Sequence, residues 1–534
     1  MSAMTDVLLL YGYYQCLPDN IQGVKIVLTK TSLADYFGSI LLQKWTVYKY
    51  VIGSSLLTAL CTYLFIFTNK FPNYDDLKFL FGKGYSLTSG RWGLDLLARV
   101  LPNYSMPWLH GMLSILLLTL SVCLIVDIFQ IKSITLQCLL AALIISFPSE
   151  IGTMLYMFTS SSYAVAFLLS VLSVFLFEKK GLYLKILAGI MLILSLSIYQ
   201  AYIAVAASFL VLRIAQRLLL SEEQPLYIII SQGVYYLIFL GVSLILYYLL
   251  TRLFLYYSNE TLNDWAMRAT STSDTFFCRL YRSWILFVAV YLKNAFGLVP
   301  NGLSMVAHGA TLLGIALSYV YIVLREKRFI KNTLLFVLLT VIFPLSVNCL
   351  VFILGENGIH GLTMFSFVSV YILAAIIFEQ LSHYRLKNLC KDIFVFSMSL
   401  IVFCNVYIAN KSYLKQYIIY ENTTSIHQAV VTQLQMTEGF SSGSKVAIIG
   451  NPARTNHVTD AFGEDSVYGL GTYTGESISE YFFTYYLGVD LNYASDQEKQ
   501  ELKKDARIKQ MEVYPYYGYI QRIDDYIVVK LGDD

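Results

Sequence analysis

Charged residues are scarce in this chain of 534 amino acids. Asp, Glu, Lys and Arg make up 14% of it, whereas hydrophobic residues make up 57%. Water-soluble domains carry roughly 25% charged residues, so this composition excludes a soluble globular protein. The chain is rich instead in Tyr (43) and Phe (33), which gather at both faces of the bilayer in membrane proteins. We conclude that it is an integral membrane protein.

Paired cysteines and a cleavable leader are also missing. The eight cysteines are scattered, mostly in or beside apolar runs: Cys16, Cys61, Cys123, Cys138, Cys278, Cys349, Cys390 and Cys404. No CxxC pair and no metal-ligand spacing occurs, which excludes a disulfide framework and a zinc site. The N-terminus lacks the short basic, apolar and small-residue pattern of a cleavable signal. The first apolar run is therefore expected to remain as a membrane anchor.

Ionisable residues are almost absent from the long apolar runs. Asp127 stands near the end of one of them. Proton-coupled transporters usually need acids or histidines inside their membrane spans. Their scarcity here argues against that class of protein.

Eleven apolar runs are long enough to be membrane spans, which take about 20 residues. We predict them at 47–68, 108–129, 134–150, 159–177, 182–199, 200–218, 227–250, 303–324, 332–354, 361–380 and 393–410. The runs 182–199 and 200–218 follow each other directly, so the chain must turn tightly near "SIYQAYIA". A further apolar segment, 283–300, is short and contains Lys293, and we interpret it as a re-entrant or interfacial helix.

Every second loop between these spans is basic. The basic positions are Lys132; Lys179 and Lys180; Arg213 and Arg217; Arg325, Lys327, Arg328 and Lys331; and Arg385, Lys387 and Lys391. Short basic loops stay in the cytoplasm, and the N-terminal segment 1–46, with its own lysines, fits the same side. Eleven spans then place the C-terminus outside.

Residues 411–534 differ from the rest of the chain. They hold 17 of its 35 acids and 11 of its 38 basic residues, as expected for a water-facing domain. Helical patterns at 425–436 and within "DQEKQELKKDARIKQ", with strand patterns in "KVAIIG" and "DDYIVVKL", predict a small α/β domain. The expected fold is thus an all-α polytopic bundle of about 11 spans (47–410) followed by a small extracytoplasmic α/β domain (411–534).

Two adjacent carboxylates, Asp75 and Asp76, lie in the outer loop 69–107. This loop and the outer loop 251–302 carry more Lys and Arg than the orientation rule explains. An anionic ligand or phospholipid headgroups would both account for the excess. "NYDDLKF" is also typical of a capped first helical turn, where acids are favoured by the helix dipole.

A carboxylate near Lys or Arg side chains can act as a general base, while those cationic side chains stabilise a departing phosphate. We prefer Asp76 as this base, because Asp75 is closer to Asn73 and is expected to serve the start of the helix. Arg91 directly follows "TSG" and is the main candidate to contact a phosphate.

Other candidate ligand contacts have simpler explanations beside them. Gln200 lies between two spans, where an interhelical hydrogen bond is the alternative. Glu356 and His360 lie in the loop "GENGIHG", which also suits a plain tight turn. The remaining candidates are Arg279, Arg282, Lys293 and Lys530; for Lys293 the alternative is snorkelling, and for Lys530 an exposed position on a strand.

Several short motifs, taken in order, resemble a known family. They are "NYDD" in the first outer loop, the helix opened by "SGRW", "SIYQAYIA", "KVAIIG" and the closing "EVYPYYGYIQRIDDYIVVKL". Over residues 45–534 the chain is similar to the polytopic glucosyltransferases of phage-borne O-antigen modification (serotype conversion) clusters. The resemblance implies a GT-C type fold with its active site at the outer membrane face and Asp75 or Asp76 as catalytic base. Where the family has a Tyr-x-Phe/Tyr-Asp element, this chain reads "YMFT", with Thr159 in place of the acid.

The resemblance implies inverting transfer of a sugar, usually glucose, from an undecaprenyl-phosphate carrier to a lipid-linked or cell-surface glycan such as the O-antigen of lipopolysaccharide. The location would be the bacterial cytoplasmic (inner) membrane. No cofactor is required and no metal is predicted, although an acid pair can bind a divalent ion. Expected partners are the donor, the glycan acceptor, membrane lipids, and a donor-making synthase and flippase; nucleic acid is not expected.

Two other functions fit the same sequence features. One is a transporter or flippase for a lipid-linked glycan, which needs a lipid-phosphate patch but no base. The other is transfer of a different sugar or group from the same carrier.

Overall fold

The computed structural model describes residues 33–78, 86–100, 104–220, 225–264, 274–294, 297–299, 301–325, 329–354, 359–381, 387–441, 443–451, 462, 467–471, 473 and 475–533. It divides into two compact units, Met1–Lys49 and Tyr50–Asp534. The expected segment 1–46 belongs to the first unit and lies mostly outside the described residues. The second unit contains everything discussed below.

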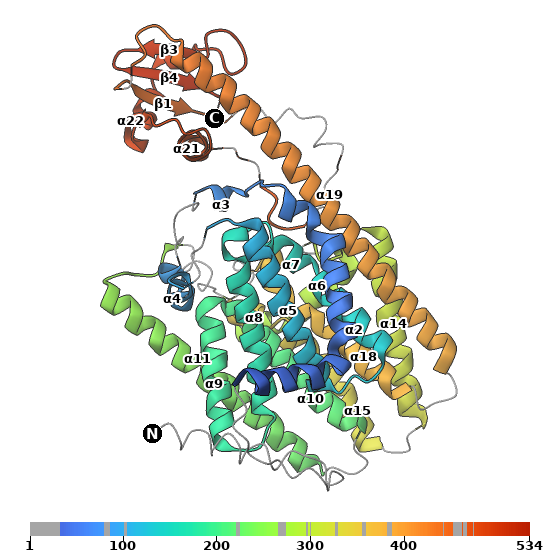
Figure 1. Cartoon of the computed structure of the whole chain (residues 1–534). Coiled ribbons are helices and arrows are strands. Elements are labelled where there is room, and N and C mark those ends of the chain that lie inside the picture. Colours follow the sequence, from blue (N-terminus) through green and yellow to red (C-terminus); the bar gives the residue numbers. More distant parts are fainter. Residues whose placement is uncertain are drawn as a thin grey trace. The chain divides into compact units, whose positions relative to one another are not determined.

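The bundle is built from helices that are apolar over most of their length (Figure 1). Its long helices are α2 (Leu33–Thr68), α5 (Pro107–Phe129), α6 (Ile134–Ile145), α8 (Met157–Phe177), α9 (Leu182–Ile198), α10 (Ile203–Leu220), α11 (Leu226–Ser258), α13 (Phe276–Lys293), α14 (Gly302–Arg325), α18 (Val368–Leu381) and α19 (Lys387–Gln435). Its short segments are α3 (Tyr74–Lys78), η1 (Leu87–Ser89), α4 (Trp92–Ala98), α7 (Pro148–Thr153), η2 (Gln200–Tyr202), α15 (Phe329–Val337), η4 (Leu338–Ile342), α16 (Phe343–Val347), α17 (Cys349–Leu354) and η6 (Gly361–Phe367).

These helices confirm the predicted membrane bundle. In the described part of the chain, nine helices are long and apolar enough to cross a membrane, and Leu182–Ile198 and Thr333–Val347 are two shorter apolar ones. Each of the eleven expected spans coincides with one of these. The 18-residue α13 is not among the helices that are long and apolar enough to cross a membrane. The interpretation of segment 283–300 as a re-entrant or interfacial helix is compatible with this.

One span is broken by proline, close to the candidate site. Pro148 begins α7 after an extended Phe147, because proline has no N–H to donate into a preceding turn. The short helix α7 then packs against η6, and Ser149 Oγ donates to the carbonyl of Gly361 at 2.6 Å. Such irregular backbone is tolerated at membrane depth where protein buries it.

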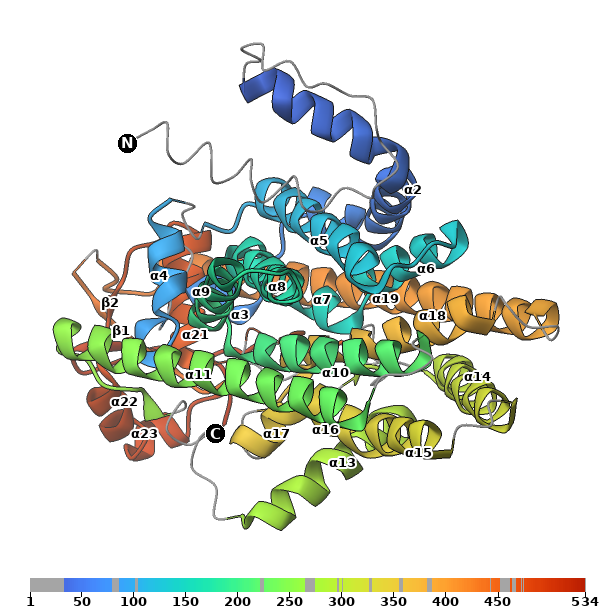
Figure 2. The ribbon, with the colours of Figure 1, turned by 90° about the horizontal axis from the view of Figure 1, so that it is seen from below.

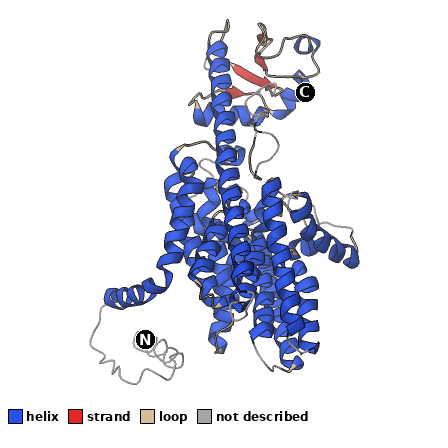
Figure 3. Ribbon diagram, turned by 90° about the vertical axis from the view of Figure 1, so that its right-hand side faces the viewer, coloured by secondary structure: helices blue, strands red, loops and turns tan. Residues whose placement is uncertain are grey.

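The C-terminal part is a small α/β domain attached to the bundle through one helix. The 49-residue α19 is continuous across position 410, where the sequence suggested a boundary, and carries the predicted helix 425–436 (Figure 1). The four strands are β1 (Lys445–Ile449), β2 (Asn492–Tyr493), β3 (Ile520–Ile523) and β4 (Tyr526–Lys530), and they pair in the order β2-β1-β4-β3. Figure 3 shows strands (red) in this domain and the helices (blue) of the bundle. β1 is parallel to β2 and β4, and β3 is antiparallel to β4.

Helices complete this domain: α21 (Glu476–Tyr481), the π-helical η7 (Phe482–Tyr486), α22 (Asp496–Leu502) and α23 (Ala506–Lys509). Valines and isoleucines of β1 and β4 form its core with Leu434 and Phe483. The expected single charged helix is in fact two, α22 and α23, because Asp505 caps a new helix by accepting from the N–H of Arg507.

The alternative given for Lys530, an exposed position on a strand, is wrong. Its side chain is buried, with 5% exposed, rather than on the solvent face of its strand. The ammonium donates to the carbonyls of Lys509 and Met511 and pairs with Asp533 at 2.8 Å. A buried ammonium needs such partners, so Lys530 joins α23 to the end of the sheet.

Candidate active site

The turn "TSGR" is bound to two membrane helices. Gly90 has a φ of +77°, which L-residues with side chains rarely adopt. Its carbonyl accepts from the hydroxyl of Tyr247 on α11 at 2.9 Å, and the amide of Gln200 in η2 donates to the carbonyl of Ser89 at 2.9 Å. Glycine is required here because a Cβ would lie 3.0 Å from the Tyr247 hydroxyl. The turn therefore fixes the residue that follows it, Arg91.

The Arg91 guanidinium lies among aromatic rings. It donates to the Tyr163 hydroxyl at 2.9 Å and, at 3.4 Å, to the side-chain oxygen of Gln200. It also stands 5.1 Å from the ring centre of Tyr199, which stacks on Tyr163 with centroids 4.3 Å apart. Cation–π contacts and a planar fork of donors hold such a group in one orientation. Gln200 thus forms the expected hydrogen bonds between helices, and its role as a ligand contact stays a prediction.

The acid pair begins helix α3, as the sequence predicts. The side-chain oxygen of Asn73 accepts from the backbone N–H groups of Asp75 (2.9 Å) and Asp76 (3.0 Å). Asn73 is therefore the cap, and neither carboxylate is needed to start the helix. Neighbouring residues on a helix point about 100° apart, so the two acids face different surroundings.

Asp76 faces the protein interior. Its side chain is 2% exposed and accepts from the Ser105 hydroxyl at 2.5 Å, while Lys70 donates to the carbonyl of Ser105. Burial raises the pKa of Asp76 to about 6, although the bond from Ser105 and the nearby Lys70 lower it. The same burial that perturbs this carboxyl group keeps it away from a large ligand.

Asp75 lies within electrostatic reach of Tyr74, Tyr468 and Arg91. The Asp75 side chain is half-buried. Burial is the main cause that raises the pKa of the Tyr74 and Tyr468 hydroxyls, and the negative charge of Asp75 raises it further. Burial lowers the pKa of Arg91, but its tyrosine neighbours and Asp75 together raise it by more. Asp75 is thus the acid that shares an environment with Arg91.

A segment of the C-terminal domain, Val467–Tyr473, lies against this acid. Gly471 exchanges backbone hydrogen bonds with the Gln416 side chain of α19, and the Tyr473 hydroxyl donates to the carbonyl of Pro72. On its other side, the Tyr468 carbonyl lies so close to Gly152 that a Cβ there would be 2.6 Å from it. The segment therefore joins the first loop to α7 and brings Tyr468 near Asp75.

Two polar atoms of this cluster lack partners in the described part of the chain. They are the hydroxyl of Tyr199 and Nδ1 of His360. The imidazole stacks on Tyr468 with centroids 4.8 Å apart, and burial followed by the charge of Arg91 lowers the pKa of His360 to about 4. Buried polar groups are normally hydrogen-bonded, so a neutral His360 and Tyr199 are both available to a polar ligand.

The other candidates have different surroundings. Arg279 donates to the carbonyl of Asp274 and Arg282 pairs with the carboxylate of Asp274 at the start of α13, while Lys293 is exposed at its last turn. Figure 2 shows α13 well apart from α4, the helix that Arg91 caps. Lys530 lies within the C-terminal domain, and Glu356 falls outside the described residues.

Most aromatic members of the cluster were not singled out from the sequence. Tyr156 and Tyr163 come from the start of α8, Tyr247 from α11 and Tyr468 from the segment 467–473, and all four are hidden among the 43 tyrosines of the chain. Glu150 was also missed: it lies in α7 with 1% exposed, so the expectation of nearly acid-free spans had an exception. Its position directly after "FPS", at a proline-broken span, was the available signal.

Comparison with known proteins shows which family this chain belongs to. The family model described as glucosyl transferase GtrII matches residues 64–373. The chain belongs to this family. The matched range begins in α2, contains Asp75, Arg91, Gln200 and His360, and ends in α18. No curated protein and no solved structure is significantly similar to the chain.

Membership of the GtrII family makes this membrane protein a glycosyltransferase with a role in glucosyl transfer. It confirms the resemblance drawn from the motifs and favours transfer over the transport alternative. Among the described residues, no three His, Cys, Asp or Glu side chains gather as a metal site requires.

Proposed function

We propose that this protein transfers glucose, with inversion, from an undecaprenyl-phosphate donor to a glycan acceptor such as O-antigen, at the outer face of the bacterial cytoplasmic membrane. The observation that carries the proposal is an Arg91 guanidinium held among aromatic rings, with the Asp75 carboxylate within electrostatic reach of it. A carboxylate and a fixed guanidinium are the two groups that this reaction needs.

In the proposed step, a hydroxyl oxygen of the acceptor attacks the anomeric carbon of glucose and forms the new glycosidic bond. The proton of that hydroxyl passes to the Asp75 carboxylate. The bond between the anomeric carbon and the phosphate oxygen breaks, and its electron pair leaves with polyprenyl phosphate. A glycosidase needs a second carboxyl group to protonate its leaving group, whereas a phosphate leaves as an anion that Arg91 can stabilise.

Accessibility favours Asp75 over Asp76 as the base. Asp75 is half-buried beside Tyr468, whereas Asp76 is 2% exposed and already binds Ser105. A base must come within hydrogen-bond reach of the proton that it removes, and Asp75 is the more exposed of the two carboxylates. We therefore propose Asp75 as base in place of the preference for Asp76 that sequence reasoning suggested.

The polar atoms around the two charges suit a sugar phosphate. The Tyr199 hydroxyl and His360 Nδ1 can bond sugar hydroxyls, and the Tyr74 and Tyr468 rings offer faces on which a sugar can pack. The Val467–Tyr473 segment would then form part of the acceptor side. Specificity for glucose would follow from these hydroxyl contacts, because a site built for a hydrogen bond rejects ligands that lack the partner.

The test uses the full chain in membranes with labelled undecaprenyl-phosphate glucose and a lipid-linked glycan. Asp75→Asn should lower kcat by roughly 10²–10⁴-fold, the usual contribution of a general base, and leave the KM of the donor nearly unchanged. Asp76→Asn is the matched control and should keep most of the activity. Full activity of Asp75→Asn at a normal protein level would refute the assignment, and loss in Asp76→Asn alone would move the base to Asp76.

Two further measurements separate the alternatives. Activity that survives EDTA would support a metal-free reaction, whereas loss restored by a divalent ion would contradict it. A protein that moves the labelled lipid across vesicles without forming glycosylated product would be a transporter, and the proposed function would then fail.

A further inference from the structure

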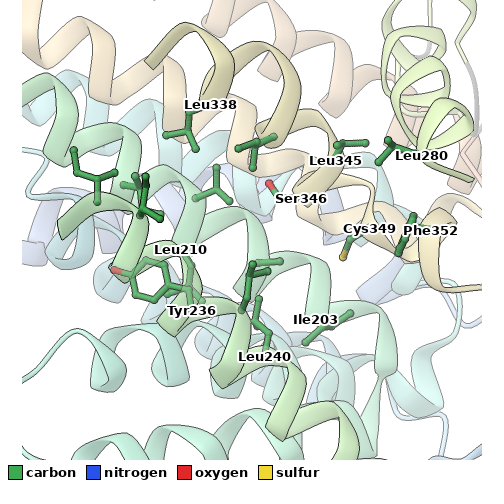
Figure 4. A pocket seen from close by; sticks show the side chains of 18 of the residues that line it. Ile203, Leu210, Tyr236, Leu240, Leu280, Leu338, Leu345, Ser346, Cys349 and Phe352 are labelled. Carbon is green, nitrogen blue, oxygen red and sulfur yellow. The ribbon is translucent and has the colours of Figure 1, made fainter. Parts of the chain in front are cut away.

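A long apolar groove lies among the helices of the bundle, and none of its lining residues is charged. It has a volume of about 470 Å³ and is bounded by α10, α11, α13 and the interrupted helix from α15 to α17 (Figure 4). This volume lies within the range of about 300–1,000 Å³ found for ligand pockets. Figure 2 shows α10, α11 and α16 side by side, viewed from below.

The lining offers almost nothing to a polar ligand. Of its residues, Tyr236, Ser346 and Cys349 carry polar side-chain atoms. The Tyr236 hydroxyl donates to Glu178, and Ser346 Oγ donates to the carbonyl of Phe343 at 2.7 Å. The thiol of Cys349 is only a weak donor. The groove therefore suits a hydrocarbon.

The groove crosses most of the apolar layer. On α10 it extends from Ile203 to Leu218, which at 1.5 Å per residue is roughly 22 Å of the ~30 Å hydrocarbon core. Two of its α11 residues, Ile230 and Leu237, are 54% and 70% exposed. A chain can therefore enter sideways from the surrounding lipid.

One end of the groove meets the Arg91 site. Ile203 directly follows η2, which contains Gln200, and Leu244 lies one helical turn before Tyr247. Gln200 and Tyr247 hold the turn that carries Arg91. The same two helices thus join an anion-binding group to the beginning of an apolar channel.

We propose that this groove holds the hydrocarbon tail of the lipid-linked sugar donor, with its phosphate at Arg91; this inference rests on the function proposed above. The bilayer is as apolar as the groove, so burial there gives no hydrophobic gain. The groove instead orients the donor. It fixes the tail so that the phosphate arrives at Arg91 and the sugar faces Asp75.

Two glycines of α11 provide a matched pair of variants. Gly233 lines the groove, and a Cβ there would find its nearest atom, Ile214 Cδ1, at 3.9 Å. Gly241 is not a lining residue, and a Cβ there would meet nothing within 4 Å. Gly233→Leu therefore fills the groove, while Gly241→Leu adds the same side chain elsewhere on the same helix.

The first experiment measures binding without catalysis. A polyprenyl phosphate with a photoreactive group in its tail is cross-linked to the full chain in detergent. Labelling of α10 and α11 peptides is expected in the wild type and in Gly241→Leu, and a fall of roughly tenfold or more in Gly233→Leu, because overpacking costs on the order of a tenfold change in affinity. Unlabelled polyprenyl phosphate should compete and phosphatidylglycerol should not. Equal competition by phosphatidylglycerol, or equal labelling of both variants, overturns the proposal.

The second experiment compares donors of different chain length. Gly233→Leu should raise the KM for undecaprenyl-phosphate glucose but leave transfer from a ten-carbon analogue unchanged. Equal loss with both donors contradicts a role in holding the tail. If no variant and no wild-type protein uses either donor, the proposed function fails, while the cross-linking result still decides whether the groove binds the lipid.

Discussion

Replacing Asp76 by Asn should make the stability of the protein less dependent on pH. Burial raises the pKa of Asp76 from 3.8 to about 6. Well below pH 4 the carboxyl group is protonated in both the folded and the unfolded states, so it does not change the free energy of unfolding. Between about pH 4 and 6 the unfolded state loses its proton more readily, so the free energy of unfolding falls, and above pH 6 the loss is constant.

The size of this effect follows from the two pKa values. Their difference, at 1.36 kcal/mol for each pH unit, amounts to about 3 kcal/mol. Because Asp76 is 2% exposed, solvent screening does not reduce it greatly. The new carboxamide also adds an unsatisfied buried N–H₂ group at a cost of about 1–3 kcal/mol, but this cost does not vary with pH.

The assay is thermal unfolding of the purified full chain in detergent from pH 4 to pH 8, for the wild type and Asp76→Asn. The difference in the free energy of unfolding, variant minus wild type, should increase by about 2 kcal/mol from pH 4 to pH 7, because the unfolded carboxyl group is already partly ionised at pH 4. Asp75→Asn, at the more exposed neighbouring position, controls for general effects of acid. A difference that stays constant over this range would refute the account of Asp76 as a buried, perturbed acid.

Three further outcomes follow from the contacts of the site. Arg91→Lys should raise the KM of the donor by roughly 10–100-fold, because one ammonium cannot replace a fork bonded to Tyr163 and Gln200; an unchanged KM would contradict the phosphate role. Gly90→Ala should lower thermal stability by about 1–2 kcal/mol and activity further, measured on the same preparation, since it strains a φ of +77°. Tyr473→Phe should speed proteolytic cleavage within 467–473, because it removes the hydroxyl that bonds to Pro72; Tyr516→Phe, at an exposed tyrosine, is the control and should show no change.

Length and pattern along the chain predicted the elements well. Apolar runs of about 20 residues have few alternatives to membrane helices, and each of the eleven expected spans coincides with an apolar helix. "KVAIIG" and "DDYIVVKL" became β1 and β4 for the same local reason, that short apolar runs rich in β-branched residues suit buried strands.

The surroundings of single side chains could not be predicted in this way. Lys530 is the charged residue of its strand and was expected to be exposed, yet its ammonium donates to the carbonyls of Lys509 and Met511. The 49-residue α19 crosses the boundary suggested by composition, because helical hydrogen bonds continue regardless of whether the side chains face lipid or water.

Composition and local pattern are enough to establish a polytopic membrane protein with an acid pair at the start of a short helix in its first outer loop, because these features depend on residues that are close in the chain. The folded structure was needed to show that Asp76 is buried against Ser105 while the more exposed Asp75 lies within electrostatic reach of Arg91. That choice depends on contacts between residues far apart in the chain, such as Tyr468 and Tyr473 with the first loop. Spacing along a sequence carries no information about which distant side chains complete a site.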